Sequence, residues 1–131
     1  MPTHETTKII GEVLAELATA WENLHPAVRP RVHLATLPMD DAEENAAIVN
    51  ALQRRATVVV QKSIAEGFGL TVAEGMWKAK PVVASAVGGI QDQIVDGETG
   101  FLVGPRDLGA FGERVVQLMR DPRLAHRIGQ A

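Results

Sequence analysis

The chain has 131 residues, of which 46 % are hydrophobic and 22 % are charged, and its formal net charge is −3. This length suits one domain with a core of its own. The sequence has no run of about 20 apolar residues, which a membrane span needs, and no basic stripe with interleaved aromatic residues, so we expect neither a membrane nor a nucleic-acid partner. It has no cysteine, and its amino terminus lacks the basic and apolar regions of a signal peptide, so we expect a cytoplasmic protein without disulfides.

The first third of the chain begins with helical periodicity. Apolar residues recur every three or four positions over residues 6–24, which predicts a helix with one buried face that ends before Pro26. A short apolar run at residues 32–35 predicts a strand. Asp40 and Glu43 have the spacing of a capping box and predict a helix that ends near residue 55.

Strands and helices then alternate to the end of the chain. Predicted strands cover residues 57–61, 81–84 and 101–103, and predicted helices cover residues 70–78, 90–94 and the stretches after Asp107 and Asp121. The helix after Asp107 has an apolar stripe of Leu108, Phe111, Val115 and Leu118. In the helix over residues 70–78, we expect Met76 and Trp77 to pack in the core. This alternation is typical of an α/β fold, a parallel sheet with helices on both faces.

The loop between the first two of these strands carries the most information. It places Glu66 and Glu74 eight positions apart around a turn that contains Gly67 and Gly69. The backbone N–H groups from Gly69 to Thr71 then lie at the positive end of a helix dipole, where a phosphate group is readily bound. Glu74 follows about one helical turn, roughly 5.4 Å, further on. A carboxylate there can accept both hydroxyls of a ribose attached to the phosphate.

A second glycine turn, Gly88 and Gly89, follows the next predicted strand. The carboxyl ends of parallel strands meet at one edge of a sheet, where open α/β folds bind ligands, so we expect the two glycine turns to be neighbours. Glu66, at the end of its strand, would face whatever lies beyond the phosphates. The spacing therefore predicts a site for a nucleotide with a further group attached.

Plainer interpretations of the same residues stay open. Glu74 taken alone is a solvated surface residue, and the glycines are turn formers. Lys62 approaches a nucleotide base or is a surface lysine, while Lys78 and Lys80 complement the dipole at a helix end. The four histidines are scattered, without metal-ligand spacing, so we expect no metal and no other cofactor.

Residues 66–74 resemble the E-x7-E motif of retaining glycosyltransferases of the GT-B fold, and the similarity continues through Gly88-Gly89-Ile90 and residues 95–103. The sequence of residues 66–72, 76–78 and 80–83 is most similar to the trehalose synthase branch, which joins glucose from a nucleoside diphosphate donor to free glucose. The resemblance covers residues 50–103 clearly and the flanking helices weakly. It implies that residues 1–131 are a single, partial, Rossmann-like domain, the nucleotide-sugar-binding C-terminal half of the GT-B fold, truncated at its front.

The resemblance also implies a role for each residue of the motif. Glu66 would be the catalytic residue that approaches the donor sugar, and Glu74 would bind the ribose. The residues expected to complete the nucleotide-sugar site are Gly67, Phe68, Gly69, Leu70, Thr71, Gly88 and Gly89. No metal is required where positive groups and helix amides carry the phosphate charge. The arginine and lysine that hold the diphosphate in this family would lie before Met1, as would the acceptor-binding lobe, so we expect the isolated chain to be inactive and to bind nucleotide weakly.

The expected partners are a nucleoside diphosphate glucose and a sugar acceptor bound by the N-terminal lobe. A truncated sheet would leave the strand at residues 32–35 without its neighbours, which predicts self-association or a repacked first helix and strand. Two alternatives to the glycosyltransferase stay open. One is a non-catalytic nucleotide-binding or assembly module, and the other is a segment of a retaining trehalose phosphorylase, in which inorganic phosphate occupies the diphosphate position.

Overall fold

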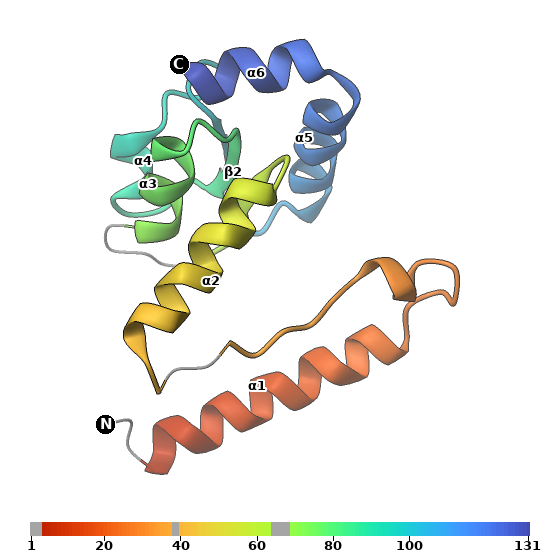
Figure 1. Ribbon diagram of the computed structural model, residues 1–131. Coiled ribbons are helices and arrows are strands. Elements are labelled where there is room, and N and C mark those ends of the chain that lie inside the picture. Colours follow the sequence, from red (N-terminus) through yellow and green to blue (C-terminus); the bar gives the residue numbers. More distant parts are fainter. Residues whose placement is uncertain (1–3, 38–39, 64–68) are drawn as a thin grey trace. The chain divides into compact units, whose positions relative to one another are not determined.

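The computed structural model describes residues 4–37, 40–63 and 69–131, with side chains from residue 11 onward. The chain divides into two compact units, Met1–Asp40 and Asp41–Ala131 (Figure 1). The interpretation of residues 1–131 as a single domain stays a prediction.

The first unit contains helix α1, His4–Glu22, and the 3-10 turn η1, Arg29–Arg31. The Nε1–H of Trp21 donates to the carbonyl oxygen of Val32 at 2.8 Å, and the Arg29 guanidinium lies over the Trp21 ring, 5.7 Å from its centroid. The predicted buried face of α1 is not formed within this unit, because Leu14 and Leu17 are 43 % and 47 % exposed.

The strand predicted at residues 32–35 is also wrong, since these residues form no strand. An isolated strand is not stable without a neighbour that pairs with its backbone groups. Here the carbonyl of Val32 accepts a side-chain hydrogen bond instead. The self-association that we expected at this edge stays a prediction.

The second unit is built on a parallel sheet of three strands in the order β1-β2-β3. The strands are β1, Val59–Gln61; β2, Val82–Ser85; and β3, Phe101–Val103. The register pairs Val59 with Val82 and Val83 with Phe101. The helices are α2, Ala42–Arg55; α3, Leu70–Trp77; α4, Ile90–Gln93; α5, Leu108–Arg120; and α6, Pro122–Gln130.

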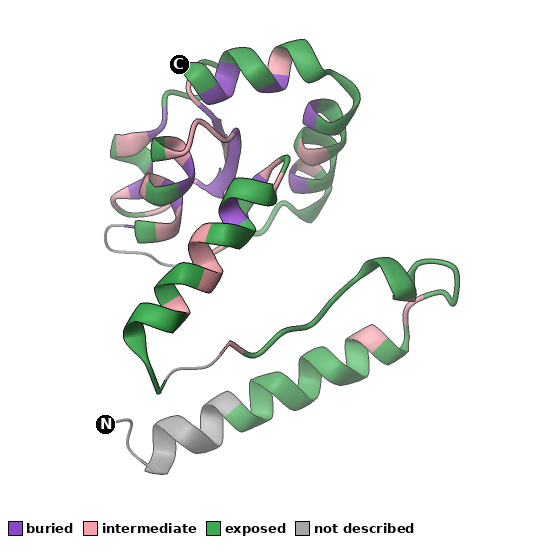
Figure 2. Cartoon of the chain, in the orientation of Figure 1, coloured by how far each residue is buried: buried purple, intermediate pink, exposed green. Residues whose placement is uncertain are grey.

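Helices cover both faces of this sheet, and β2 is buried along its whole length (Figure 2). On one face Val82 and Ala84 pack with α3 and α4, in a cluster that includes Val72 and Ile90. On the other face lies a second cluster made of Val83, Phe101, Val103, Phe111, Leu118, Ala125 and Ile128. A strand buried on both faces is apolar at successive positions rather than at alternate ones, as the sequence of β2 is. The predicted α/β class, with a parallel sheet between helices, is confirmed.

Aspartates cap three of these helices. The side chain of Asp107 accepts from the N–H of Ala110 at 3.0 Å, and that of Asp121 accepts from the N–H of Leu124 at 3.1 Å, as predicted. At the start of α2, however, the cap is Asp41 rather than Asp40. Its Oδ1 accepts from the N–H groups of Glu43 and Glu44 at 2.9 and 3.2 Å. The helix therefore begins one residue later than the predicted capping box implies.

Two apolar side chains lie outside the core that they were expected to join. Trp77, at the end of α3, is 90 % exposed, while Val72 and Met76 on the same helix pack against the sheet. Successive helical residues are about 100° apart. With Met76 facing the sheet, Trp77 is therefore directed away from it. Leu108, the first residue of α5, is 66 % exposed.

Candidate functional site

The start of α3 lies at the carboxyl end of β1, on a glycine with a left-handed backbone. Gly69 has φ 76° and ψ 64° and is the N-cap residue. The N–H groups of Val72 and Ala73 donate to its carbonyl oxygen at 3.1 and 3.3 Å. The N–H groups of Leu70 and Thr71 therefore precede the helical ladder, as the first N–H groups of any helix do. Glu66, Gly67 and Phe68, which we expected to join them, lie outside the described residues.

Gly69 lies directly beside α4, the helix that follows the second glycine turn. A Cβ added to Gly69 would come within 2.6 Å of Ile90 Cγ1 and within 3.7 Å of Gln93 Nε2, and both of these residues belong to α4. Gly88 has φ 51°, and Gly89 is the N-cap residue of α4. Gly69 and the helix that follows Gly88 and Gly89 are therefore neighbours, while Gly67, the other glycine of the first turn, lies outside the described residues.

A buried serine ties these two strand ends together. Ser85, the last residue of β2, has no exposed surface, and its Oγ accepts from the backbone N–H of Ser63 at 2.6 Å. Ser63 Oγ in turn accepts from Gln61 Nε2 at 2.8 Å. The chain that leaves β1 toward Glu66 is therefore anchored to the neighbouring strand.

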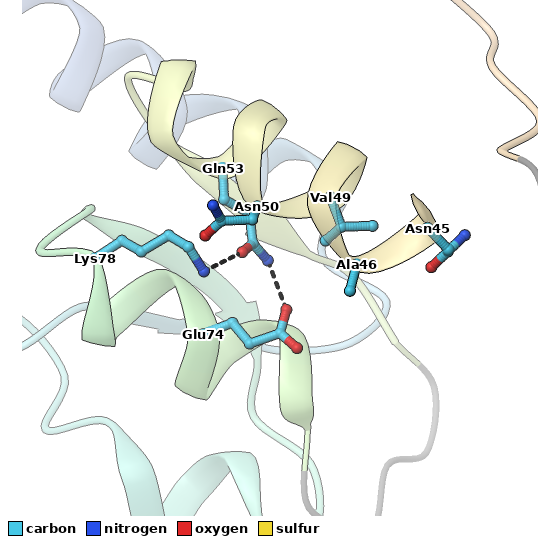
Figure 3. A pocket seen from close by; sticks show the side chains of 7 residues that line it. All are labelled: Asn45, Ala46, Val49, Asn50, Gln53, Glu74 and Lys78. Atoms are coloured by element: carbon cyan, nitrogen blue, oxygen red, sulfur yellow. Dashed lines mark hydrogen bonds between the residues drawn. The ribbon is translucent and has the colours of Figure 1, made fainter. Parts of the chain in front are cut away.

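Glu74 lies on α3 and lines a pocket of about 280 Å³ (Figure 3). The other lining residues come from α2 and from the end of α3: Asn45, Ala46, Val49, Asn50, Gln53 and Lys78. The Nε2–H of Gln53 donates to Glu74 Oε2 at 2.9 Å, and Lys78 Nζ donates to Gln53 Oε1 at 2.7 Å. Figure 3 shows the three side chains pointing toward one another. The pocket therefore combines a carboxylate acceptor with amide groups and a short apolar wall.

Gln53 was not among the predicted site residues, and Lys78 was expected only to complement the helix dipole. The helical spacing of both residues nevertheless indicates their positions in the site. Gln53 falls at the spacing of Ala46 and Val49, on the face that α2 turns toward α3, and a polar residue on such a face needs a hydrogen-bond partner. Lys78 is four residues after Glu74, so the two share a face of α3. What the sequence does not reveal is that α2 supplies the residue between them.

Two features are absent from the described residues. Among the side chains of residues 11–37, 40–63 and 69–131, no group of three or more histidine, aspartate and glutamate side chains could hold a metal ion. None of the helices in these ranges has the length and apolar character to cross a membrane.

A family model described as glycosyl transferases group 1 matches residues 42–131. The chain belongs to this family. It is 57 % identical to trehalose synthase from Pyrococcus horikoshii over 81 residues, which make up 62 % of this chain and 19 % of that protein. The chain thus spans about a fifth of the length of this curated relative.

Solved structures agree with the family. The C-terminal domain of a glycosyl transferase group 1 family protein from Francisella tularensis superposes with a TM-score of 0.71 and 25 % sequence identity, covering 98 % of this chain and 60 % of that chain. Anabaena Alr3699/HepE, solved in complex with UDP, has a TM-score of 0.58 and 28 % identity, covering 60 % of this chain and 22 % of that one. The predicted resemblance to the C-terminal half of GT-B glycosyltransferases is confirmed.

Proposed function

We propose that this chain is the donor-binding domain of a retaining glycosyltransferase, and that the native protein transfers glucose from a nucleoside diphosphate sugar to glucose to form trehalose. The observation that carries the proposal is the geometry at the start of α3. The amides of Leu70 and Thr71 open that helix beside α4, which follows the Gly88–Gly89 turn, and Glu74 follows on the same helix. This is an arrangement that suits a phosphate and a ribose.

The diphosphate would lie at the start of α3. The helix N-terminus carries a partial positive charge and N–H donors that are not used within the helix, and both favour an anion there. At Gly69 the missing side chain makes room for Ile90 of α4, while the Gly88–Gly89 turn brings backbone rather than side chains to this edge. UDP in the complex of Anabaena Alr3699/HepE supports a nucleotide as the ligand.

The ribose would be bound by Glu74. Its carboxylate lines the pocket between α2 and α3, and an ionised carboxylate only accepts hydrogen bonds, so it suits the two hydroxyls of a ribose. Glucose as the transferred sugar, glucose as the acceptor and trehalose as the product are supported by the name of the Pyrococcus horikoshii relative.

In the proposed reaction, the bond between the donor's anomeric carbon and the diphosphate breaks, and the diphosphate leaves with the electron pair. Fixed amides at the start of α3 stabilise the negative charge that develops on it. The oxygen of the acceptor hydroxyl attacks the same face of the sugar and its proton passes to the leaving diphosphate, so the anomeric configuration is retained. Glu66 would orient the donor sugar, and the acceptor would bind to another lobe of the native protein. No cofactor or metal is part of this proposal, and the cysteine-free sequence favours a cytoplasmic location.

The test is a transfer assay on the native protein that contains this chain. It is incubated with nucleoside diphosphate glucose and glucose, and NMR detects trehalose and its anomeric configuration. A parallel reaction supplies trehalose and inorganic phosphate. We expect trehalose with retained configuration in the first reaction and no glucose 1-phosphate in the second. Phosphate-dependent cleavage of trehalose would identify a phosphorylase, and nucleotide binding without transfer would identify a non-catalytic module; either result contradicts the proposal.

A further inference from the structure

Two hydrogen bonds link Lys78 to Glu74 through the side-chain amide of Gln53 (Figure 3). An ammonium group has only donors and an ionised carboxylate has only acceptors. The amide of Gln53 can therefore form both bonds in one orientation alone, with its oxygen toward Lys78 and its nitrogen toward Glu74. The link has a fixed direction, from the cation to the carboxylate.

The middle member of this link is held firmly, while the carboxylate at its end stays accessible. Gln53 is 7 % exposed, and the two bonds satisfy its oxygen and one N–H of its amide. Glu74 is exposed and would otherwise sample several rotamers, which costs conformational entropy when a ligand fixes it. A bond from a buried amide removes part of that freedom before a ligand arrives.

The bond from Gln53 occupies one acceptor position of the Glu74 carboxylate. A carboxylate has about four such positions on its two oxygens, so those of Oε1 and a second one on Oε2 stay available for a ligand. We propose that Gln53 and Lys78 are positioning residues that hold Glu74 ready to accept the vicinal hydroxyls of a ribose. This inference rests on the proposed function, because it takes the ligand of Glu74 to be the ribose of a nucleoside diphosphate.

The test compares two probes that differ only in those hydroxyls, UDP and 2′,3′-dideoxyuridine diphosphate. Their affinities for the 131-residue chain are measured by ligand-observed NMR, which detects millimolar binding. Three variants are used. Gln53→Met removes both bonds, Gln53→Glu keeps an acceptor for Lys78 but cannot donate to Glu74 when ionised, and Lys78→Met leaves Gln53 in place.

We expect the wild-type chain to prefer UDP. In Gln53→Met and Gln53→Glu this preference should fall about tenfold, the equivalent of one hydrogen bond to a charged group. In Lys78→Met it should fall less, because the bond to Glu74 remains. The affinity for the dideoxy probe should stay unchanged in all three variants.

The matched control is Gln117→Met on α5, which removes a bond from Arg114 Nη1 to an exposed glutamine away from the pocket. It should leave the preference for UDP unchanged.

Equal losses for both probes in the Gln53 variants, or an unchanged preference in every variant, would overturn the positioning role and leave the proposed function intact. A wild-type chain that binds both probes equally would instead contradict the ribose contact on which the proposed function depends. Lys78→Met keeps the inference testable if the Gln53 variants do not fold.

Discussion

Gly69 and Ile90 approach so closely that no other residue fits at the first position. A Cβ on Gly69 would lie 2.6 Å from Ile90 Cγ1, and Ile90 is fully buried among residues of the sheet and α3, so its side chain cannot move aside. The contact joins the start of α3 to the start of α4. It therefore fixes the two glycine turns relative to each other at the proposed diphosphate position.

Replacing Gly69 by alanine should destabilise the fold in two ways. The backbone has φ 76°, which costs an L-residue about 1–2 kcal/mol, and the overlap with Ile90 adds about 1–3 kcal/mol. Gly97→Ala is the matched control, because Gly97 has φ 81° but nothing within 4 Å of its Cβ position. Urea denaturation should show a clearly larger loss of unfolding free energy for Gly69→Ala, and equal losses would refute the packing argument.

Replacing Ala79 by glycine should stabilise the fold rather than destabilise it. Its φ is 57°, and it follows α3 in a Schellman motif, in which the N–H of Lys80 donates to the carbonyl oxygen of Gly75 at 3.0 Å and its own N–H donates to that of Met76 at 3.0 Å. Glycine adopts this conformation without strain, so Ala79→Gly should stabilise the fold by about 0.5–1 kcal/mol. Ala47→Gly, at an exposed position inside α2, should destabilise it by a similar amount. A lower melting temperature for Ala79→Gly would contradict the prediction.

Glu74→Ala should weaken the binding of a nucleoside diphosphate by about a hundredfold or more, because two hydrogen bonds from hydroxyls to a charged acceptor are lost. The change should also lower the melting temperature modestly, because the buried amide of Gln53 loses its acceptor. Glu113→Ala, at an exposed position on α5, is the control. If Glu74→Ala altered thermal stability alone, the plain interpretation of Glu74 as a surface residue would be correct.

Glu66 should behave differently in the native protein, because its proposed partner is the reacting sugar. Glu66→Ala should lower kcat more than it raises KM for the donor, whereas Glu74→Ala should act mainly on KM. Steady-state kinetics of both variants with a nucleoside diphosphate glucose decide this. Equal and small effects of the two substitutions would rule out the assignment.

The sequence alone predicts the elements whose causes are local. The stretch Phe101–Val103 is a strand with the expected bounds, and Asp107 and Asp121 cap the helices that follow them. The strand expected at residues 32–35 is absent because a strand depends on its neighbours, which a single apolar run does not specify. The prediction that Trp77 packs in the core is wrong because a hydrophobic side chain does not by itself show that its helical position faces the sheet.

The candidate site likewise contains residues that a local motif predicts and residues that only tertiary packing brings together. The glycines, the start of α3 and Glu74 follow from one continuous motif, so the sequence reveals them together. Gln53 is 21 residues away from Glu74, and their contact depends on how α2 packs against α3. The bond between Ser63 and Ser85 likewise depends on the pairing of β1 with β2. These residues belong to the site through tertiary structure, which periodicity does not encode.

The proposed function depends first on the binding of a nucleoside diphosphate at the start of α3. The most direct measurement is a titration of the ¹⁵N-labelled chain with UDP, followed by the backbone amide resonances. We expect saturable shifts at Leu70 and Thr71, with accompanying shifts at Gly88 and Gly89. The absence of shifts at these four residues at millimolar UDP, or shifts confined to the opposite edge of the sheet around Lys80 and His126, would contradict it.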